Sequence, residues 1–179
     1  SVVCSFSNGS SYQGPMVDDR YEGKGTFSFA NGTQYVGDFK SGEFHGQGSL
    51  TYADGTSYSG GFESGSFSGE GTLSNSQGLT YSGSFKNGKF NGTGRIALAD
   101  GGGYNGEFMD GIPHGTGKLY DASLNVSKEG VFENGILKQE KGDEHDHSHK
   151  PAVDLSTMKE SPPSPKKEDL PPPPPPPPP

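Results

Sequence analysis

Apolar and polar positions alternate along most of this chain, and the alternation returns with a fixed period of 23 residues. One complete unit is Tyr35–Ser57, YVGDFKSGEFHGQGSLTYADGTS. Tyrosine, glycine and phenylalanine occupy every second position of its first half, and phenylalanine, glycine and leucine do so in its second half. Because strand side chains alternate between two faces, each half predicts a strand with one ring-and-glycine face and one mostly polar face. Helix is disfavoured by the density of glycine.

Turn residues separate these predicted strands. Lys40-Ser41-Gly42-Glu43 lies between the two halves of the unit, and Asp54-Gly55 closes it. Asp-Gly between alternating apolar runs is a strong signal for a tight hairpin, so we expect the chain to reverse tightly there. Each unit is thus predicted to be a β-hairpin, paired antiparallel with the next one.

The same frame returns along about three quarters of the chain. Units begin at Tyr12, Tyr35, Tyr58, Tyr81 and Tyr104, with partial units at both ends: residues 6–11, and Gly130, Phe132 and Asn134-Gly135. A fixed period of this length indicates a repeat fold, in which each unit contacts only its neighbours and the array offers a long surface. We expect an all-β repeat array over residues 1–139 and a separate tail over residues 140–179.

Glycines inside the predicted strands need an explanation, because glycine otherwise weakens a strand. Gly42, Gly55, Gly65 and Gly88 suit turns, whereas Gly37, Gly46 and Gly48 lie within the alternating runs. We predict that aromatic rings of neighbouring strands lie over the in-strand glycines, an arrangement that fixes register. The alternative is that these glycines serve only turns and bends.

The pattern Y-x-G-x-F…G-x-F-H-G-x-G-x-L-x-Y-x-D-G-x-x-Y over Tyr35–Tyr58 resembles the MORN repeat, over residues ~6–137. The resemblance implies consecutive hairpins in an open, twisted, single-layer antiparallel sheet, with a concave aromatic groove for partner peptides or self-association. It also implies a cytoskeletal, ciliary or membrane-junction scaffold, or the regulatory part of a larger enzyme. Departures from the pattern place the best part of the groove in Tyr35–Leu98. They are Met16, Asp19, Asn75, Pro113 and Asp121.

An open sheet with one aromatic face predicts an interaction surface, since large apolar patches on soluble proteins usually mark one. With two strands per unit, five units give a sheet on the order of 50 Å long. The residues expected to line the groove are Phe39, Phe44, Tyr52, Phe62, Phe67, Phe85 and Phe90. They would receive an extended or helical segment of another protein. The alternative is that these rings pack on one another as a thin core. Open sheet edges also allow a homodimer.

The formal net charge of −8 narrows the partners. Residues 1–138 carry 9 Lys/Arg against 14 Asp/Glu, and the tail carries 5 against 8. An acidic surface repels phosphate, so nucleic acid is excluded as a partner and membrane binding is disfavoured. The single cysteine, Cys4, cannot form an internal disulfide, which favours a reducing compartment and a cytoplasmic location, with cytoskeleton or cilium implied by the resemblance.

The tail carries three short motifs. His145, His147 and His149 alternate between acids, which suits either a metal ion or, as we favour, a solvated polar tract. Pro162, Pro165 and Lys167 resemble an SH3 ligand, and Ser164 between prolines suits a proline-directed kinase. Pro171–Pro179 predicts a polyproline II rod that fits profilin, EVH1, WW or SH3 domains, or is merely low-complexity sequence.

No catalytic constellation is recognisable. Gly23-Lys24-Gly25 lies within a strand-like run rather than before a helix, and His45 and His114 share one position of the repeat. We therefore predict a non-enzymatic adaptor without a cofactor. The alternatives are a phosphoinositide-associated targeting module and a regulatory fragment of a larger MORN-containing enzyme.

Overall fold

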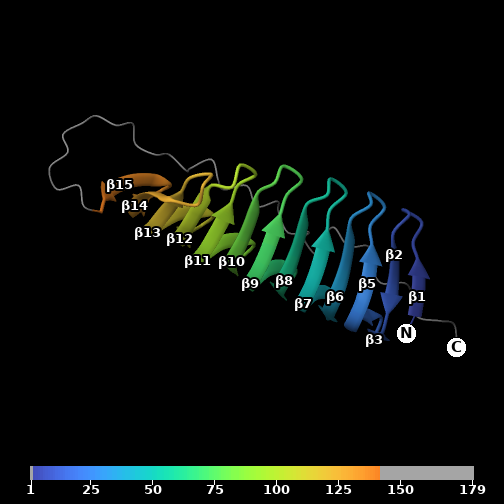
Figure 1. Ribbon diagram of the computed structural model, residues 1–179. Helices are drawn as coiled ribbons and strands as arrows, with labels where there is room; N and C mark the ends of the chain where they lie inside the picture. Colours follow the sequence, from blue (N-terminus) through green and yellow to red (C-terminus); the bar gives the residue numbers. More distant parts are fainter. Residues whose placement is uncertain (1, 142–179) are drawn as a thin grey trace, which may run out of the picture.

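The computed structural model describes residues 2–141, and this part of the chain consists of strands and their connections (Figure 1). The strands are β1 (Val2–Ser5), β2 (Ser11–Gly14), β3 (Met16–Val17), β4 (Arg20–Tyr21), β5 (Gly23–Ser28), β6 (Gln34–Lys40), β7 (Glu43–Thr51), β8 (Ser57–Glu63), β9 (Ser66–Ser74), β10 (Thr80–Lys86), β11 (Lys89–Ala97), β12 (Gly103–Met109), β13 (Ile112–Tyr120), β14 (Val126–Glu133) and β15 (Ile136–Glu140). The predicted all-β class is therefore confirmed.

Thirteen of these strands form one open antiparallel sheet in the order β1-β2-β5-β6-β7-β8-β9-β10-β11-β12-β13-β14-β15. Neighbours in the sheet are neighbours in sequence, apart from the small separate hairpin β3–β4. The hairpins lie side by side in a row, with β1 at one end and β15 at the other (Figure 1). This is the open array that the 23-residue period predicted.

The tight two-residue turn of each unit lies at Ser41-Gly42 and the equivalent residues of the other units, rather than at Asp54-Gly55. Strand β6 ends at Lys40 and β7 begins at Glu43, and both intervening residues have positive φ, 51° at Ser41 and 83° at Gly42. Positive φ at both central positions defines the type I′ turn that suits a two-residue hairpin. Asn134-Gly135 in the last unit adopts the same turn.

Asp54-Gly55 connects two antiparallel strands of a hairpin, but the connection is wider than the tight turn that was predicted. These residues lie in a five-residue connection between Thr51 and Ser57. Here the Tyr52 amide donates to the carbonyl of Thr56 (2.7 Å), and the Asp54 carboxylate accepts from the Thr56 amide (2.9 Å). An aspartate side chain that binds its own backbone two residues on favours a wider loop, which accounts for the difference.

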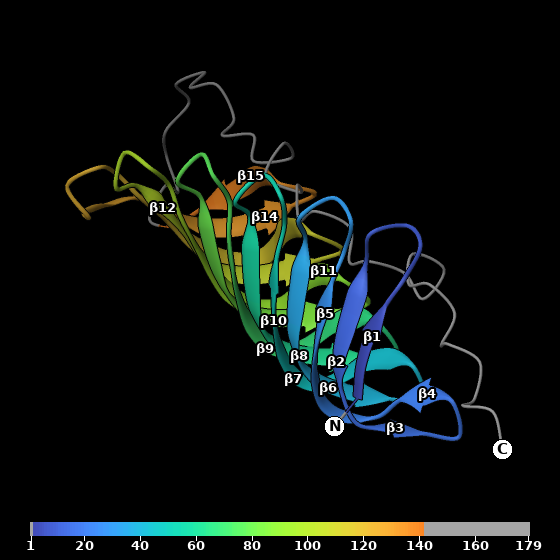
Figure 2. The ribbon, with the colours of Figure 1, turned by 90° about the vertical axis from the view of Figure 1, so that its right-hand side faces the viewer.

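The four hairpins from β6–β7 to β12–β13 bend sharply at their middle. In β6–β7, Gly37 pairs with Gly48 while the next residue, Asp38, pairs with His45, so Gly46 and Gln47 form a bulge. Gly46 has φ +62°, which an L side chain rarely adopts, and the Asp38 carboxylate accepts from the Gln47 amide at 3.0 Å. The hairpins β8–β9, β10–β11 and β12–β13 shift register at the equivalent place. Bulges of this kind bend the strands of a sheet, and Figure 2 shows the resulting curvature.

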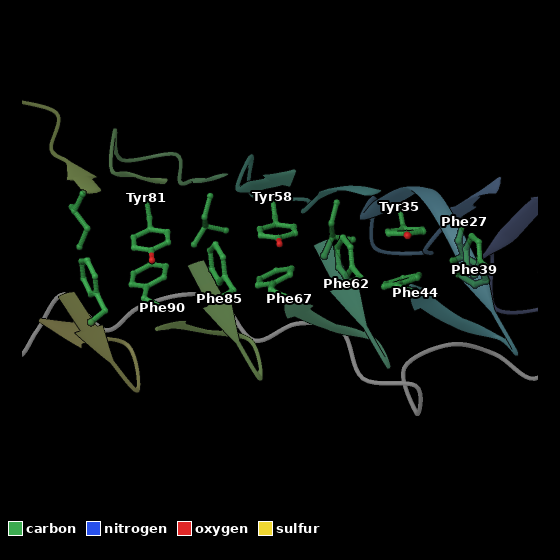
Figure 3. Packing of buried hydrophobic residues seen from close by; sticks show 14 of the residues in the cluster. Phe27, Tyr35, Phe39, Phe44, Tyr58, Phe62, Phe67, Tyr81, Phe85 and Phe90 are labelled. Atoms are coloured by element: carbon green, nitrogen blue, oxygen red, sulfur yellow. The ribbon is translucent and has the colours of Figure 1, made fainter. Parts of the chain in front are cut away.

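The bend divides each hairpin into two halves that face each other, and the hydrophobic core lies between these halves. Tyr35, near the start of β6, stacks on Phe44, near the start of β7, with ring centroids 3.8 Å apart and an interplanar angle of 13°. Tyr58 stacks on Phe67 and Tyr81 on Phe90 in the same way, at 3.9 and 3.8 Å (Figure 3). In the described part of the chain no helix bundle or second large sheet covers the ring-bearing face; the bent sheet instead buries the rings between its own two halves.

Neighbouring hairpins are also joined at their tight turns. The amide of Gly42 donates to the carbonyl of Tyr21 in the preceding unit, and that of Gly65 to the carbonyl of Phe44, both at 3.0 Å. The amides of Gly88, Gly111 and Gly135 make the corresponding bonds to Phe67, Phe90 and Pro113. Each unit is thus anchored on its predecessor, which is the nearest-neighbour coupling expected of a repeat array.

Candidate interaction surface

The tyrosine that opens each unit is fixed by one hydrogen bond and a floor of glycine. The Tyr35 hydroxyl donates to the carbonyl of Asp38 at the bend (2.6 Å). A Cβ built on Gly48 would lie 2.6 Å from the Tyr35 ring, so only glycine leaves room there. The equivalent hydroxyl bonds join Tyr12 to Pro15 (2.7 Å), Tyr58 to Gly61 (2.7 Å), Tyr81 to Ser84 (2.7 Å) and Tyr104 to Glu107 (3.0 Å).

The predicted ring-over-glycine packing is confirmed for Gly48. A Cβ on Gly37 would first meet the backbone of Gly48 and Gln47 and then the hydroxyl of Tyr35 in its own strand, so close approach of the paired strand requires glycine there. For Gly46 the prediction is wrong, because this glycine meets the side chain of Asp38 rather than a ring and serves the bend through its positive φ. The turn-only interpretation thus holds for one of the three in-strand glycines.

Burial has a chemical consequence for these tyrosines. Loss of hydration raises the pKa of Tyr12 and Tyr104 to about 12, and it raises the pKa of Tyr35, Tyr58 and Tyr81 further. Their hydroxyls therefore stay protonated donors over the whole physiological pH range, which makes the bend bonds permanent features of the fold.

Six of the seven residues expected to line a groove are at most 3% exposed: Phe39, Phe44, Phe62, Phe67, Phe85 and Phe90. They pack edge to face on the tyrosines and on one another, as Phe62 does on both Tyr35 and Tyr58 (5.2 and 5.1 Å). These rings offer almost no area to a partner, and the thin-core alternative describes their packing. Binding of a partner to this surface stays a prediction.

Partly exposed apolar side chains gather where the five-residue connections close over the core. We call Phe29, Tyr52, Leu79 and Leu98 the apolar rim; each packs against the core without being fully buried. Phe29 lies 4.6 Å from Phe27 and 6.4 Å from Phe44, ring to ring. Tyr52 is thus the one predicted groove residue that remains partly exposed. Sequence reasoning named it but missed Phe29 and Leu98, although they stand 23 residues before it and 46 after it.

The ring packing also extends beyond the predicted segment Tyr35–Leu98. Tyr104 and Phe108 are as deeply buried as their counterparts, and Tyr104 packs on Phe132 at 5.1 Å. In the first unit Tyr21 takes the place of Phe44 and contacts Tyr12 at 4.3 Å. The departures from the repeat pattern therefore do not interrupt the core.

The outer faces of the sheet are polar. An open depression of ≈ 580 Å³ on strands β2–β7 is lined by residues such as Gln13, Lys24, Asp38 and Gln47. Within residues 2–141, no three His, Cys, Asp or Glu side chains come together as metal ligands. His45 is half-buried beside the bend, and the Nδ1 of His114 accepts from the Asn134 amide at 3.4 Å, so both belong to the repeat framework.

The two ends of the sheet differ. At the β15 end, Lys128 pairs with Glu140 and Lys141 with Glu129, both at 3.1 Å. Charged side chains of this kind protect a sheet edge. At the other end, Val2 and Val3 of β1 are 43% and 73% exposed.

The tail predictions, namely the histidine tract, Pro162, Pro165, Lys167, the phosphorylation site Ser164 and the polyproline run, lie outside the described residues. In the described part of the chain, no helix has the length and apolarity to cross a bilayer.

Comparison with known families bears on the repeats directly. A family model described as "MORN repeat" matches five consecutive segments, residues 12–34, 35–57, 58–80, 81–103 and 104–126. Each segment begins at one of the five tyrosines whose hydroxyl groups donate a hydrogen bond to a backbone carbonyl at the bend. No curated protein gives a match to this chain.

Proposed function

The chain belongs to the MORN-repeat family, whose repeats are generally modules for interaction with proteins or membranes, and we propose that it is a non-enzymatic scaffold that binds a segment of another protein. The observation that carries this proposal is the apolar rim, a row of partly exposed apolar side chains packed on the aromatic core.

The spacing of the rim suggests the kind of segment that fits it. Phe29, Tyr52 and Leu98 stand at one position of the repeat, and successive units lie two strands apart, roughly 10 Å. An extended peptide covers that distance in about three residues and a helix in about two turns. In a strand, residues three apart point to opposite faces, so the partner segment we propose is a helix with apolar side chains at about every seventh residue.

The buried phenylalanines have a supporting role in this proposal. Phe44 holds Phe29 from below, and Tyr35 holds Phe44, so the rim rests on packed rings and loses little entropy on binding. Replacement of Phe67 or Phe90 would not test binding, because each is fully buried and its loss would first destabilise the fold.

The test is a binding assay on rim variants. Proteins captured by the wild-type chain are compared with those captured by Tyr52→Ser plus Leu98→Ser, with Val36→Ser on the polar face as matched control. Since a ring at an interface centre contributes about 2 kcal/mol or more, we expect a loss of affinity of at least about 30-fold in the rim variant. If the folded rim variant kept every partner, the rim would not be the binding site.

A membrane-associated module is the second candidate, because the family's repeats include membrane-binding modules. The excess of acidic residues in the array argues against an anionic membrane. Flotation with liposomes, with and without phosphoinositides, separates the two candidates: co-flotation at physiological salt would favour the membrane.

Four further expectations remain part of the proposal: a cytoplasmic, cytoskeletal or ciliary location, self-association through a sheet edge, tail binding to SH3, profilin or EVH1 domains, and an origin as the regulatory part of a larger enzyme. The exposed valines of β1 favour that edge for self-association, which sedimentation analysis would measure.

A further inference from the structure

The residues beside the tight turns vary in charge and polarity from one unit of the array to the next. Each turn is flanked by two residues that pair across the hairpin: Lys40 with Glu43, Glu63 with Ser66, Lys86 with Lys89, Met109 with Ile112, and Glu133 with Ile136. The core residues repeat from unit to unit while these pairs change in charge and polarity. Variable positions on a constant framework are where a repeat protein can carry specificity.

One of these pairs is electrostatically unfavourable as it stands. Lys86 and Lys89 are directly opposite each other across the Asn87-Gly88 turn, and both are exposed. Like charges in this position destabilise a hairpin, whereas Lys40 and Glu43 form the favourable opposite pair in an earlier unit. Among residues 2–141, neither ammonium has a carboxylate within 4.0 Å; the nearest units carry Glu63 and Asp110 at their own turns.

An apolar pair lies next to this basic one. Met109 is 46% exposed and pairs with the half-buried Ile112 at the tip of the following hairpin. Strands β11 and β12 are hydrogen-bonded neighbours, so the two tips are adjacent. We call Lys86, Lys89, Met109 and Ile112 the tip patch; its chemistry fits an acidic segment that also carries apolar side chains.

The charge distribution favours this half of the array for such a segment. Residues 2–80 carry 3 Lys/Arg against 8 Asp/Glu, a difference of −5, whereas residues 81–141 carry 7 against 7. An acidic peptide is repelled from the first half and meets no net repulsion in the second.

The chain itself contains a segment of this chemistry within reach. Residues 143–155 read DEHDHSHKPAVDL, with four acids against one lysine and with Val153 and Leu155. Strand β15 lies four strands from β11, about 19 Å, and it runs away from the tips, so Lys141 lies about 25 Å from Lys89. Extended, the five residues after Lys141 span about 17 Å, which leaves Asp143, Glu144 and Asp146 short of Lys89. The thirteen residues up to Asp154 span about 44 Å, so Asp154 can reach it.

We propose that residues 143–155 dock on the tip patch of the same chain, with the carboxylate of Asp154 on Lys86 and Lys89 and with Val153 and Leu155 on Met109 and Ile112. The docked segment relieves the repulsion between the two ammoniums and covers the exposed methionine. This goes beyond the proposed function and uses a different surface from the apolar rim, so either proposal can fail without the other.

Paramagnetic relaxation enhancement in the full-length chain tests the docking. A nitroxide is attached at Ser148→Cys in a Cys4→Ser background, and amide signals of the array are compared with the label oxidised and reduced. We expect the signals of Asn87, Gly88 and Met109 to lose more than half of their intensity.

The control is a second charge reversal at another tip. Lys86→Glu plus Lys89→Glu should restore the intensities, while Lys40→Glu should leave them reduced. Broadening confined to residues 136–141, or broadening that survives the reversal at Lys86 and Lys89, would overturn the proposal. A mixture of nitroxide-labelled chains without ¹⁵N and ¹⁵N chains without nitroxide detects contacts between two copies. Broadening that appears only in this mixture would overturn the proposal as well, in favour of docking between two copies.

Discussion

Substitution of a floor glycine tests how the fold is held together. At Gly48 an alanine Cβ would lie 2.6 Å from both Cε2 and the hydroxyl oxygen of Tyr35, closer than real Cβ contacts come. The ring cannot yield easily, because its other face stacks on Phe44 at 3.8 Å and its hydroxyl donates to Asp38. Gly48→Ala therefore has to displace a fully buried ring.

The expected loss of stability follows from the hydrogen bond and the packing contacts that the displaced ring loses. A buried hydrogen bond contributes about 1 kcal/mol, and overpacking of a core costs about 1–3 kcal/mol. We expect Gly48→Ala to lower the free energy of unfolding by about 3 kcal/mol. Gly69→Ala is the matched control, because nothing lies within 4 Å of that Cβ and only the positive φ of 70° opposes it, a cost of roughly 1–2 kcal/mol.

Urea unfolding measures both variants, followed by far-UV circular dichroism and by tyrosine fluorescence, since the chain has no Trp. A double-mutant cycle then isolates the contact: Gly48→Ala is repeated in a Tyr35→Leu background, where no ring covers the glycine. There we expect the cost of the alanine to fall by about 2 kcal/mol. An alanine whose cost is the same with and without the ring would refute the reasoning.

Three further predictions follow from the same packing. Burial raises the pKa values of Tyr12 and Tyr104 from 10.0 to about 12. The stabilisation that comes from these shifts is therefore complete below pH 10 and is lost as the pH rises toward 12. In urea titrations at alkaline pH, ionisation of each tyrosine should lower the unfolding free energy by up to about 1.4 kcal/mol per pH unit. Ser41→Asn should raise the unfolding free energy by about 0.5 kcal/mol in urea, because asparagine tolerates the positive φ of 51° better, and an unchanged or lower value would contradict the turn assignment. Phe67→Ala should lower it by about 3–5 kcal/mol, and a loss under 1 kcal/mol would mean that this ring is not a core residue.

The fold could be predicted from the sequence because its period and its alternation agree at every unit. Alternation places Tyr35, Gly37 and Phe39 on one face of a strand, and the 23-residue spacing shows that the same strand follows again. These two signals are local, so they fix the strands, their order and the antiparallel pairing.

The bend could not be predicted in this way, and it changes the meaning of the ring-bearing face. Alternation cannot distinguish Gly46, which creates the bulge through its positive φ, from Gly48, which lies beneath a ring. A flat sheet would expose Phe44, whereas the bent sheet stacks it on Tyr35. The candidate surface thereby moved from the phenylalanines to the apolar rim, of which only Tyr52 was foreseen.

The turns show the same limit of local reasoning. Asp54-Gly55 and Ser41-Gly42 both read as turns, and the side-chain bond of Asp54 to the Thr56 amide decides which is the wider loop. The unfavourable pair Lys86–Lys89 became visible only once the register placed the two lysines opposite each other.

The central claim is that the aromatic face is closed by its own sheet, and photochemical polarisation of the tyrosines in NMR tests it most directly, since a dye in solution polarises only accessible rings. The account predicts signals from Tyr52 and Tyr120, which are partly exposed, and none from the six buried tyrosines: Tyr12, Tyr21, Tyr35, Tyr58, Tyr81 and Tyr104. Strong polarisation of Tyr35, Tyr58 or Tyr81 in the folded protein would contradict the claim and return the open aromatic groove to consideration.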